Sequence, residues 1–220
     1  MKIGILGTGM VGNTIGSKMI ALGHVVKMGS RTENNEKGAE WVKKNGSRAS
    51  QGTFASAASF GEIIFNCTSG GASLDVLKGI GAENLKGKIL VDIANPLDFS
   101  KGMPPILIPG LCNTTSLGEE IQKAIPEARV VKTLNTTNAY IMINPSLLPG
   151  EHDMFICGND ETAKGEIKEI LQSGFGWKSI IDLGDIANSR ATEGILPIWI
   201  RLYGKFKSPE FNFKVVRKTV

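Results

Sequence analysis

A short apolar strand, a glycine-rich turn and a helix open the chain, and they constrain its fold more than any other feature. Residues 2–6 are apolar after the initial lysine, the G-x-G-x-x-G pattern of residues 7–12 follows, and residues 13–22 are amphipathic. Glycines in this context allow a tight turn, close approach to a pyrophosphate and close helix–strand packing. The helix N-terminus attracts phosphate. The pattern favours a dinucleotide site over a glycine turn without ligand, with these cofactor-binding residues: Gly7, Thr8, Gly9, Met10, Val11 and Gly12.

The residues after the second predicted strand, 24–29, indicate which dinucleotide binds. A protein that prefers NAD usually has Asp or Glu there, where it binds the ribose 2′-hydroxyl. This chain has Ser30, Arg31 and Thr32 instead. A guanidinium pairs well with a 2′-phosphate, and hydroxyls donate hydrogen bonds to it. The sequence therefore predicts NADP(H), with Lys37 as a second cation; the alternative for both basic residues is a solvated surface side chain.

Alternating strands and helices predict an α/β fold with a Rossmann-type, doubly wound, mostly parallel sheet. Further strands are expected at residues 47–52, 62–67, 88–93 and 128–134. After Leu134 we expect a loop at 138–148, a strand at 153–157, a helix at 160–172 capped by Asp160, a strand at 178–183 and a helix at 186–203. We predict an NADP(H)-binding domain, 1–137, and a small C-terminal α/β lobe, 138–220, that closes the acceptor cleft.

Composition excludes several classes of protein. The 220 residues carry a net charge of +4, with 25 scattered basic residues that form no nucleic-acid-binding patch. We find no apolar stretch of ~20 residues and no leader, so we expect no membrane partner and a cytoplasmic location. Three distant cysteines indicate reduced thiols rather than a metal site. The apolar tail, 211–216, is expected to dock on its own or a neighbouring subunit, and we expect a homodimer.

Three more strand ends carry small or polar residues and point at the same crevice. They are Cys67, Thr68 and Ser69, then Asn95 and Pro96, and finally Asn135 and Thr136. Such residues suit the approach of a ribose and a carboxamide, although each segment alone can be a plain turn.

Groups for acid–base catalysis are scarce. His24 is expected to be structural, His152 to be a surface loop residue, and Cys67 to be a buried apolar side chain rather than a reactive thiol. Hydride exchange between two cofactor rings needs juxtaposed faces and excluded water more than a general base. We therefore predict no catalytic acid or base.

Several segments together resemble one family across essentially the whole chain: residues 29–31, 130–136, 155–161, 185–190 and 196–199. The chain is similar to the coenzyme F420-dependent NADP oxidoreductases. This resemblance implies an N-terminal domain for NADP(H), a C-terminal lobe that helps to form a deazaflavin cleft, and direct hydride transfer between the two rings. The same fold forms the NADPH-binding part of membrane metalloreductases, which pass electrons to a flavin.

The resemblance also implies roles for individual positions. The pyrophosphate would contact Thr8, Met10 and Val11; the 2′-phosphate Ser30, Arg31 and Lys37; the nicotinamide ribose Cys67, Thr68, Asn95 and Pro96; and the acceptor Asn135 and its neighbours. The chain differs from deazaflavin-using members, which have bulkier groups at residues 69–71 and a histidine near Asn135. The acceptor is thus left open between a deazaflavin, a flavin and another small molecule.

The sequence predicts an NADP(H)-dependent oxidoreductase. One alternative is a small imine or ketone reductase, whose proton donor would have to be Tyr140, Lys132 or His152. A second alternative is a non-catalytic NADP(H) sensor, since fold is a poor guide to function.

Overall fold

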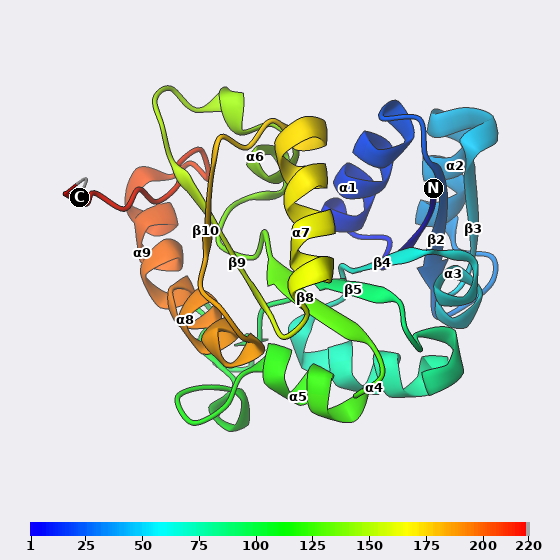
Figure 1. Ribbon diagram of the computed structural model, residues 1–220, viewed down its shortest axis with the longest axis horizontal. Helices are drawn as coiled ribbons and strands as arrows, with labels where there is room; N and C mark the ends of the chain where they lie inside the picture. Colours follow the sequence, from blue (N-terminus) through cyan, green and yellow to red (C-terminus); the bar gives the residue numbers. More distant parts are fainter. Residues whose placement is uncertain (219–220) are drawn as a thin grey trace.

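Eight strands form one sheet in the computed structural model, which describes residues 1–218. Their order across the sheet is β10-β9-β8-β5-β4-β1-β2-β3 (Figure 1). The strands are β1 (Lys2–Leu6), β2 (Val25–Ser30), β3 (Ala49–Thr53), β4 (Ile63–Asn66), β5 (Ile89–Asp92), β8 (Arg129–Thr133), β9 (Asp153–Gly158) and β10 (Ser179–Asp182).

The six strands of this sheet that come first along the chain, β1 to β5 and β8, are mutually parallel, which confirms the predicted doubly wound α/β fold. Strand β9 pairs with β8 in the antiparallel sense, and β10 runs parallel to β9. The C-terminal segment therefore extends the same sheet with two strands of opposite direction. The division of the chain after residue 137 stays a prediction.

Helices cover both faces of the sheet (Figure 1). On one face lie α1 (Met10–Ala21), α2 (Glu36–Asn45), α6 (Ala139–Ile143) and α7 (Glu161–Glu169), which continues as a π-helical segment, Ile170–Phe175. On the other lie α3 (Phe54–Phe60), α4 (Gly70–Ile80) and α5 (Leu117–Ala124). The helices α8 (Ser189–Gly194) and α9 (Leu196–Phe206) follow near the C-terminus. Each face buries its own apolar core, and the core of the first face includes Trp41 and Trp177.

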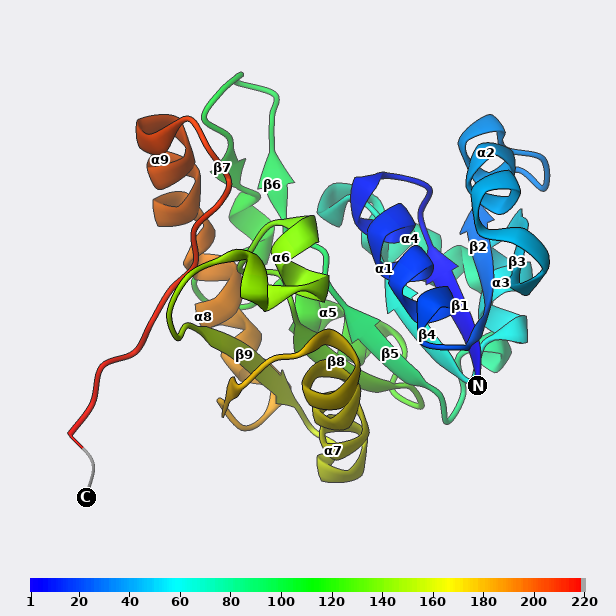
Figure 2. The same cartoon turned by 90° about the horizontal axis from the view of Figure 1, so that it is seen from above.

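Three local features differ from the sequence-based expectations. The expected loop at 138–148 contains α6, because the Asn138 side chain accepts hydrogen bonds from the N–H groups of Tyr140 and Ile141. The expected helix at 186–203 is broken between α8 and α9, where Pro197 stands in the first turn of α9. A short hairpin, β6 (Leu97–Asp98) and β7 (Ile106–Leu107), projects beside α9 (Figure 2). The Asp160 cap is confirmed, since its side chain accepts from the N–H of Ala163.

The tail docks on its own chain. The carbonyl of Phe213 accepts a hydrogen bond of 2.9 Å from the N–H of Asp153, at the start of β9. The ring of Phe211 lies 5.2 Å from that of Trp199 on α9. This confirms docking within the subunit, whereas the homodimer and the cytoplasmic location stay predictions. Over residues 1–218, every helix is too short or too polar to cross a membrane.

Candidate functional site

The glycine turn lies where the strand order reverses, between β1 and its neighbour β4. Gly7 has φ +119°, and a Cβ there would lie 2.6 Å from the carbonyl oxygen of Cys67. A Cβ at Gly12 would overlap the carbonyl oxygen of Gly7. Around Gly9, by contrast, a Cβ would meet no described atom within 4 Å. Two glycines are thus required by the packing of the chain, and the third borders open space.

Asn13 fixes this turn. Its side-chain amide donates to the carbonyls of Thr8 and Gly9, at 3.0 and 3.1 Å. Gly9 is the N-cap of α1 and offers no side chain to the first-turn amides, and that turn holds no acidic residue. The free N–H groups and the positive end of the helix therefore face the open space beside Gly9.

A cavity of about 450 Å³ lies beyond the end of β2, lined by Ser30 and Arg31 together with α3 and α4 residues that include Asp75. Ser30 is buried, and its hydroxyl donates to the Thr32 carbonyl at 2.6 Å and accepts from the Thr32 N–H at 3.2 Å. Its proton thus stabilises the loop, which the sequence did not predict. Arg31, Thr32 and Lys37 are exposed, and neither cation forms an ion pair with another residue of 1–218.

A larger cleft of about 550 Å³ lies between the strand ends and the helices α6 and α9. Seven residues that the sequence analysis assigned to the cofactor or the acceptor line it: Met10, Val11, Cys67, Thr68, Ser69, Asn95 and Asn135. Its other walls are mainly apolar, with Leu97, Phe99, Met142, Leu196, Trp199 and Tyr203. Within residues 1–218, the lining includes no Asp, Glu, His, Lys or Arg.

Two residues expected at this crevice lie behind its surface. Pro96 and Thr136 are outside the set of lining residues, and Thr136 is almost fully buried, whereas Thr137 lines the cleft. Gly70, among the small residues after β4, is required by packing, because a Cβ there would overlap the carbonyl of Asn95. This close approach explains why no bulkier group follows β4 at that position.

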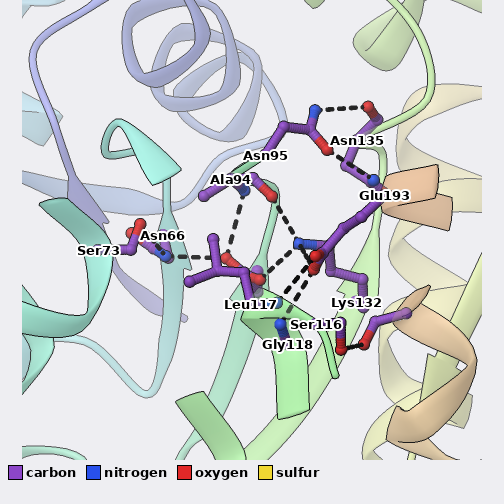
Figure 3. A network of polar contacts seen from close by, with 12 residues as sticks. Asn66, Ser73, Ala94, Asn95, Ser116, Leu117, Gly118, Lys132, Asn135 and Glu193 are labelled. Atoms are coloured by element: carbon purple, nitrogen blue, oxygen red, sulfur yellow. Dashed lines mark hydrogen bonds and ion pairs between the residues drawn. The ribbon is translucent and has the colours of Figure 1, made fainter. Parts of the chain in front are cut away.

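A left-handed residue turns the chain into the cleft after β8. Leu134 is fully buried with φ +65°, a conformation that is rare outside glycine and is found at functional sites. The amide of Asn135 then donates to Asn95 Oδ1 at 2.9 Å and to the Thr192 carbonyl at 3.0 Å. Asn95 in turn donates to the Asn135 carbonyl at 2.8 Å (Figure 3).

A buried ionic network lies next to Asn95 and Asn135. The Lys132 ammonium contacts Asp92 Oδ2 at 2.7 Å, Glu193 Oε1 at 2.8 Å and the carbonyl of Ala94 at 2.5 Å (Figure 3). Glu193 also accepts the N–H groups of Leu117 and Gly118 at the start of α5. The network thus joins β5, β8, α5 and α8 next to Asn95 and Thr192.

The protonation states follow from burial and neighbouring charge. Burial lowers the pKa of Lys132, but Asp92 and Glu193 outweigh it, so the pKa is raised and the ammonium stays charged. Burial raises the pKa of Glu193, and Lys132 only partly opposes this. Burial, reinforced by Asp92, raises the pKa of the Cys67 thiol. Cys67 is therefore a neutral side chain in the cleft wall, consistent with its expected apolar role.

Of the three proton donors considered from the sequence, one reaches the cleft. Lys132 is fully buried in the ionic network and does not line the cleft. His152 contacts the Pro145 carbonyl at 3.0 Å, packs edge-on against Trp177 and lines a different cavity. Tyr140 lines the cleft and is 57% exposed.

Comparison with known proteins places the chain in a family. The profile of the family described as "NADP oxidoreductase coenzyme F420-dependent" matches residues 2–96. The F420-dependent NADP reductase of Methanocaldococcus jannaschii is 30% identical over 225 residues, which cover 98% of each protein. The chain belongs to this family. Accordingly, it is an NADP-dependent oxidoreductase.

Solved structures agree with this assignment. The crystal structure of a candidate F420-dependent NADP reductase from Arthrobacter sp. FB24 superposes with a TM-score of 0.93 at 47% identity, covering 99% of this chain and 100% of that one. Rat metalloreductase STEAP3 is 29% identical over 90% of this chain and 38% of its own length. An imine reductase of Streptomyces aurantiacus shares the fold at 16% identity and a TM-score of 0.64, over 94% of this chain and 64% of its own.

Sequence reasoning missed the ionic network and the apolar wall of the cleft. A signal for the network was present, because Asp92 and Lys132 stand inside apolar runs that were expected to be buried strands, and buried charges are usually paired. Trp199 and Phe99 gave no comparable signal. Their place at the cleft depends on the break before α9 and on the β6–β7 hairpin.

Proposed function

We propose that the chain transfers hydride between NADP(H) and a deazaflavin of the F420 type held in the 550 Å³ cleft. When bound, the two cofactors would supply the chemistry, with the reduced nicotinamide as hydride donor and the deazaflavin ring as hydride acceptor. The observation that carries the proposal is an uncharged, largely apolar cleft that opens beside the glycine turn.

The residues of this chain would bind NADP(H) and orient its nicotinamide ring. The turn around Gly9 and the start of α1 suit the pyrophosphate. Arg31, supported by Lys37 and the Thr32 hydroxyl, would hold the 2′-phosphate on a loop shaped by Ser30. The nicotinamide ribose would lie against the ends of β4 and β5, at these cleft-lining residues: Cys67, Thr68, Ser69 and Asn95.

The lining favours exchange between rings over imine or ketone reduction. Those reductions require a proton donor for the nitrogen or oxygen bonded to the carbon that takes up hydride. Of the three candidates, Lys132 and His152 lie away from the cleft, which leaves only the exposed Tyr140 at its lining. Apolar walls exclude water and bring two ring faces together, which is what direct hydride transfer requires.

The test follows NADPH oxidation in parallel with F420, FMN, ferric citrate and a cyclic imine. We expect kcat/KM for F420 to exceed that for FMN by about tenfold or more, because the cleft positions a hydride acceptor. Turnover of the imine without turnover of F420 would show the runner-up activity. Tight NADPH binding without turnover of any acceptor would show a sensor.

Replacing Arg31 by alanine is expected to weaken NADPH binding by about 2 kcal/mol, roughly 30-fold, because charge-assisted bonds to the 2′-phosphate are lost. Binding of NADH, which lacks that phosphate, should change little. Titration of both cofactors, with Lys37→Ala as a comparison of smaller effect, measures this. Equal weakening of NADPH and NADH would contradict the assignment.

A further inference from the structure

Three residues that line the cleft each have a buried polar atom with no partner among residues 1–218. These atoms are Asn135 Oδ1, Thr137 Oγ1 and Trp199 Nε1. Buried donors and acceptors are nearly always paired, and leaving one unpaired is unfavourable because the group has lost its hydrogen bonds to water. Three such atoms in one cleft therefore point to polar groups that a ligand brings.

The orientation of the Asn135 side chain is determined by its neighbours. Its Nδ2 lies within hydrogen-bond distance of two oxygens, Asn95 Oδ1 and the Thr192 carbonyl. A flipped amide would set its oxygen against both of them, so the nitrogen must occupy this place. The Asn135 side chain, 2% exposed, is thus left with one acceptor.

The Trp199 indole is held from two sides. Its ring stacks on Tyr203, with centroids 5.8 Å apart and planes 8° apart, and packs on Phe211 at 5.2 Å. An indole nitrogen only donates. The other two tryptophans use theirs: Trp41 donates to Ser17 Oγ at 3.0 Å and Trp177 to the Met142 carbonyl at 2.8 Å. All three tryptophans lie within residues 1–218, and Trp199 is the one whose buried N–H has no partner there.

We propose that Trp199 is a specificity-determining residue, and that its N–H donates to a ring carbonyl of the acceptor while Asn135 Oδ1 accepts from a ring N–H. A donor and an acceptor in a largely apolar cleft fit a heterocycle that alternates carbonyl and N–H along one edge. The pyrimidinedione edge of deazaflavins and flavins has this pattern, and a ferric chelate does not. The proposal rests on the proposed function and defines the edge by which the acceptor ring is recognised.

Trp199→Phe tests the donor, because phenylalanine keeps an aromatic ring on Tyr203 and removes only the N–H and part of the indole. The probes are 5-deazariboflavin and riboflavin, with NADPH as the reductant. We expect KM for both rings to rise about tenfold, the effect of one lost hydrogen bond in a desolvated site, while KM for NADPH stays unchanged. An unchanged KM for both rings would overturn the role of Trp199. An equal rise in KM for NADPH would show a structural effect instead.

A second measurement needs no variant. Wild-type protein is assayed with 3-methyl-5-deazariboflavin, whose blocked ring nitrogen can no longer donate to Asn135. We expect KM to rise about tenfold relative to 5-deazariboflavin, because the acceptor in the cleft stays unpaired. No rise would overturn the pairing with Asn135. If the wild-type protein reduces none of these rings, the proposed function is overturned. If it reduces them and Trp199→Phe has no effect on KM, only the role of Trp199 is overturned.

Discussion

Lys132→Met is expected to destabilise the protein by about 3–5 kcal/mol, because it leaves the buried carboxylates of Asp92 and Glu193 without their cation. Methionine matches the length of the lysine stem, so the lost charge dominates over lost packing. Urea unfolding at pH 8 measures the change. Lys168→Met is the matched control, since Lys168 also pairs with a carboxylate, Asp182, but both side chains are partly exposed. Its cost should be about 0–1 kcal/mol.

The loss in Lys132→Met should shrink as the pH falls from 8 to 5. Burial already raises the pKa of Glu193 in the fold, and removal of the ammonium raises it further. A folded-state pKa above the unfolded value means that the folded protein binds more protons in that window, so its stability rises as the pH falls. The rise in stability as the pH falls is larger in the variant than in the wild type. A loss below about 1 kcal/mol, or one independent of pH, would contradict the proposed charge state of the network.

Much of the sheet could be predicted because its signals are local. The strands at the glycine turn, at Ile63–Asn66 and at Ile89–Asp92 are short apolar runs bounded by glycine or polar residues. The direction of β9 has no such signal. It is set by pairing with β8, where Thr133 lies opposite Ile156, and nothing in either run specifies antiparallel pairing.

The candidate site divides in the same way. The cofactor end could be outlined from consecutive residues, because the glycine turn and the segment at Arg31 each fit a known spacing. The acceptor end could not, because its walls come from α6, α9 and the hairpin, which meet only in the folded chain. Even at the cofactor end the sequence did not predict every contact, since the Ser30 hydroxyl donates its hydrogen bond to the Thr32 carbonyl.

Gly9→Ala is expected to remove tight NADPH binding and to leave the stability of the fold unchanged. Gly9 has φ −78° and ψ −176°, a conformation that any residue adopts, and a Cβ there meets no described atom within 4 Å. The methyl group would instead occupy the space in which the pyrophosphate fits. We expect NADPH affinity to fall about a hundredfold or more, close to 3 kcal/mol. Fluorescence titration and urea unfolding measure the two quantities separately.

Gly12→Ala is the comparison for Gly9→Ala, because it should change both stability and NADPH affinity. Its Cβ would overlap the carbonyl of Gly7, so α1 must shift away from the turn, and both stability and NADPH affinity should fall. Gly165→Ala, where a Cβ on α7 also meets open space, should leave NADPH affinity unchanged and raise stability by about 0.5–1 kcal/mol, because alanine is favoured over glycine inside a helix. Unimpaired NADPH binding in Gly9→Ala would mean that the pyrophosphate does not pass this turn. Loss of binding without loss of stability at Gly9, and loss of both at Gly12, would separate the glycine that a ligand requires from the glycine that the fold requires.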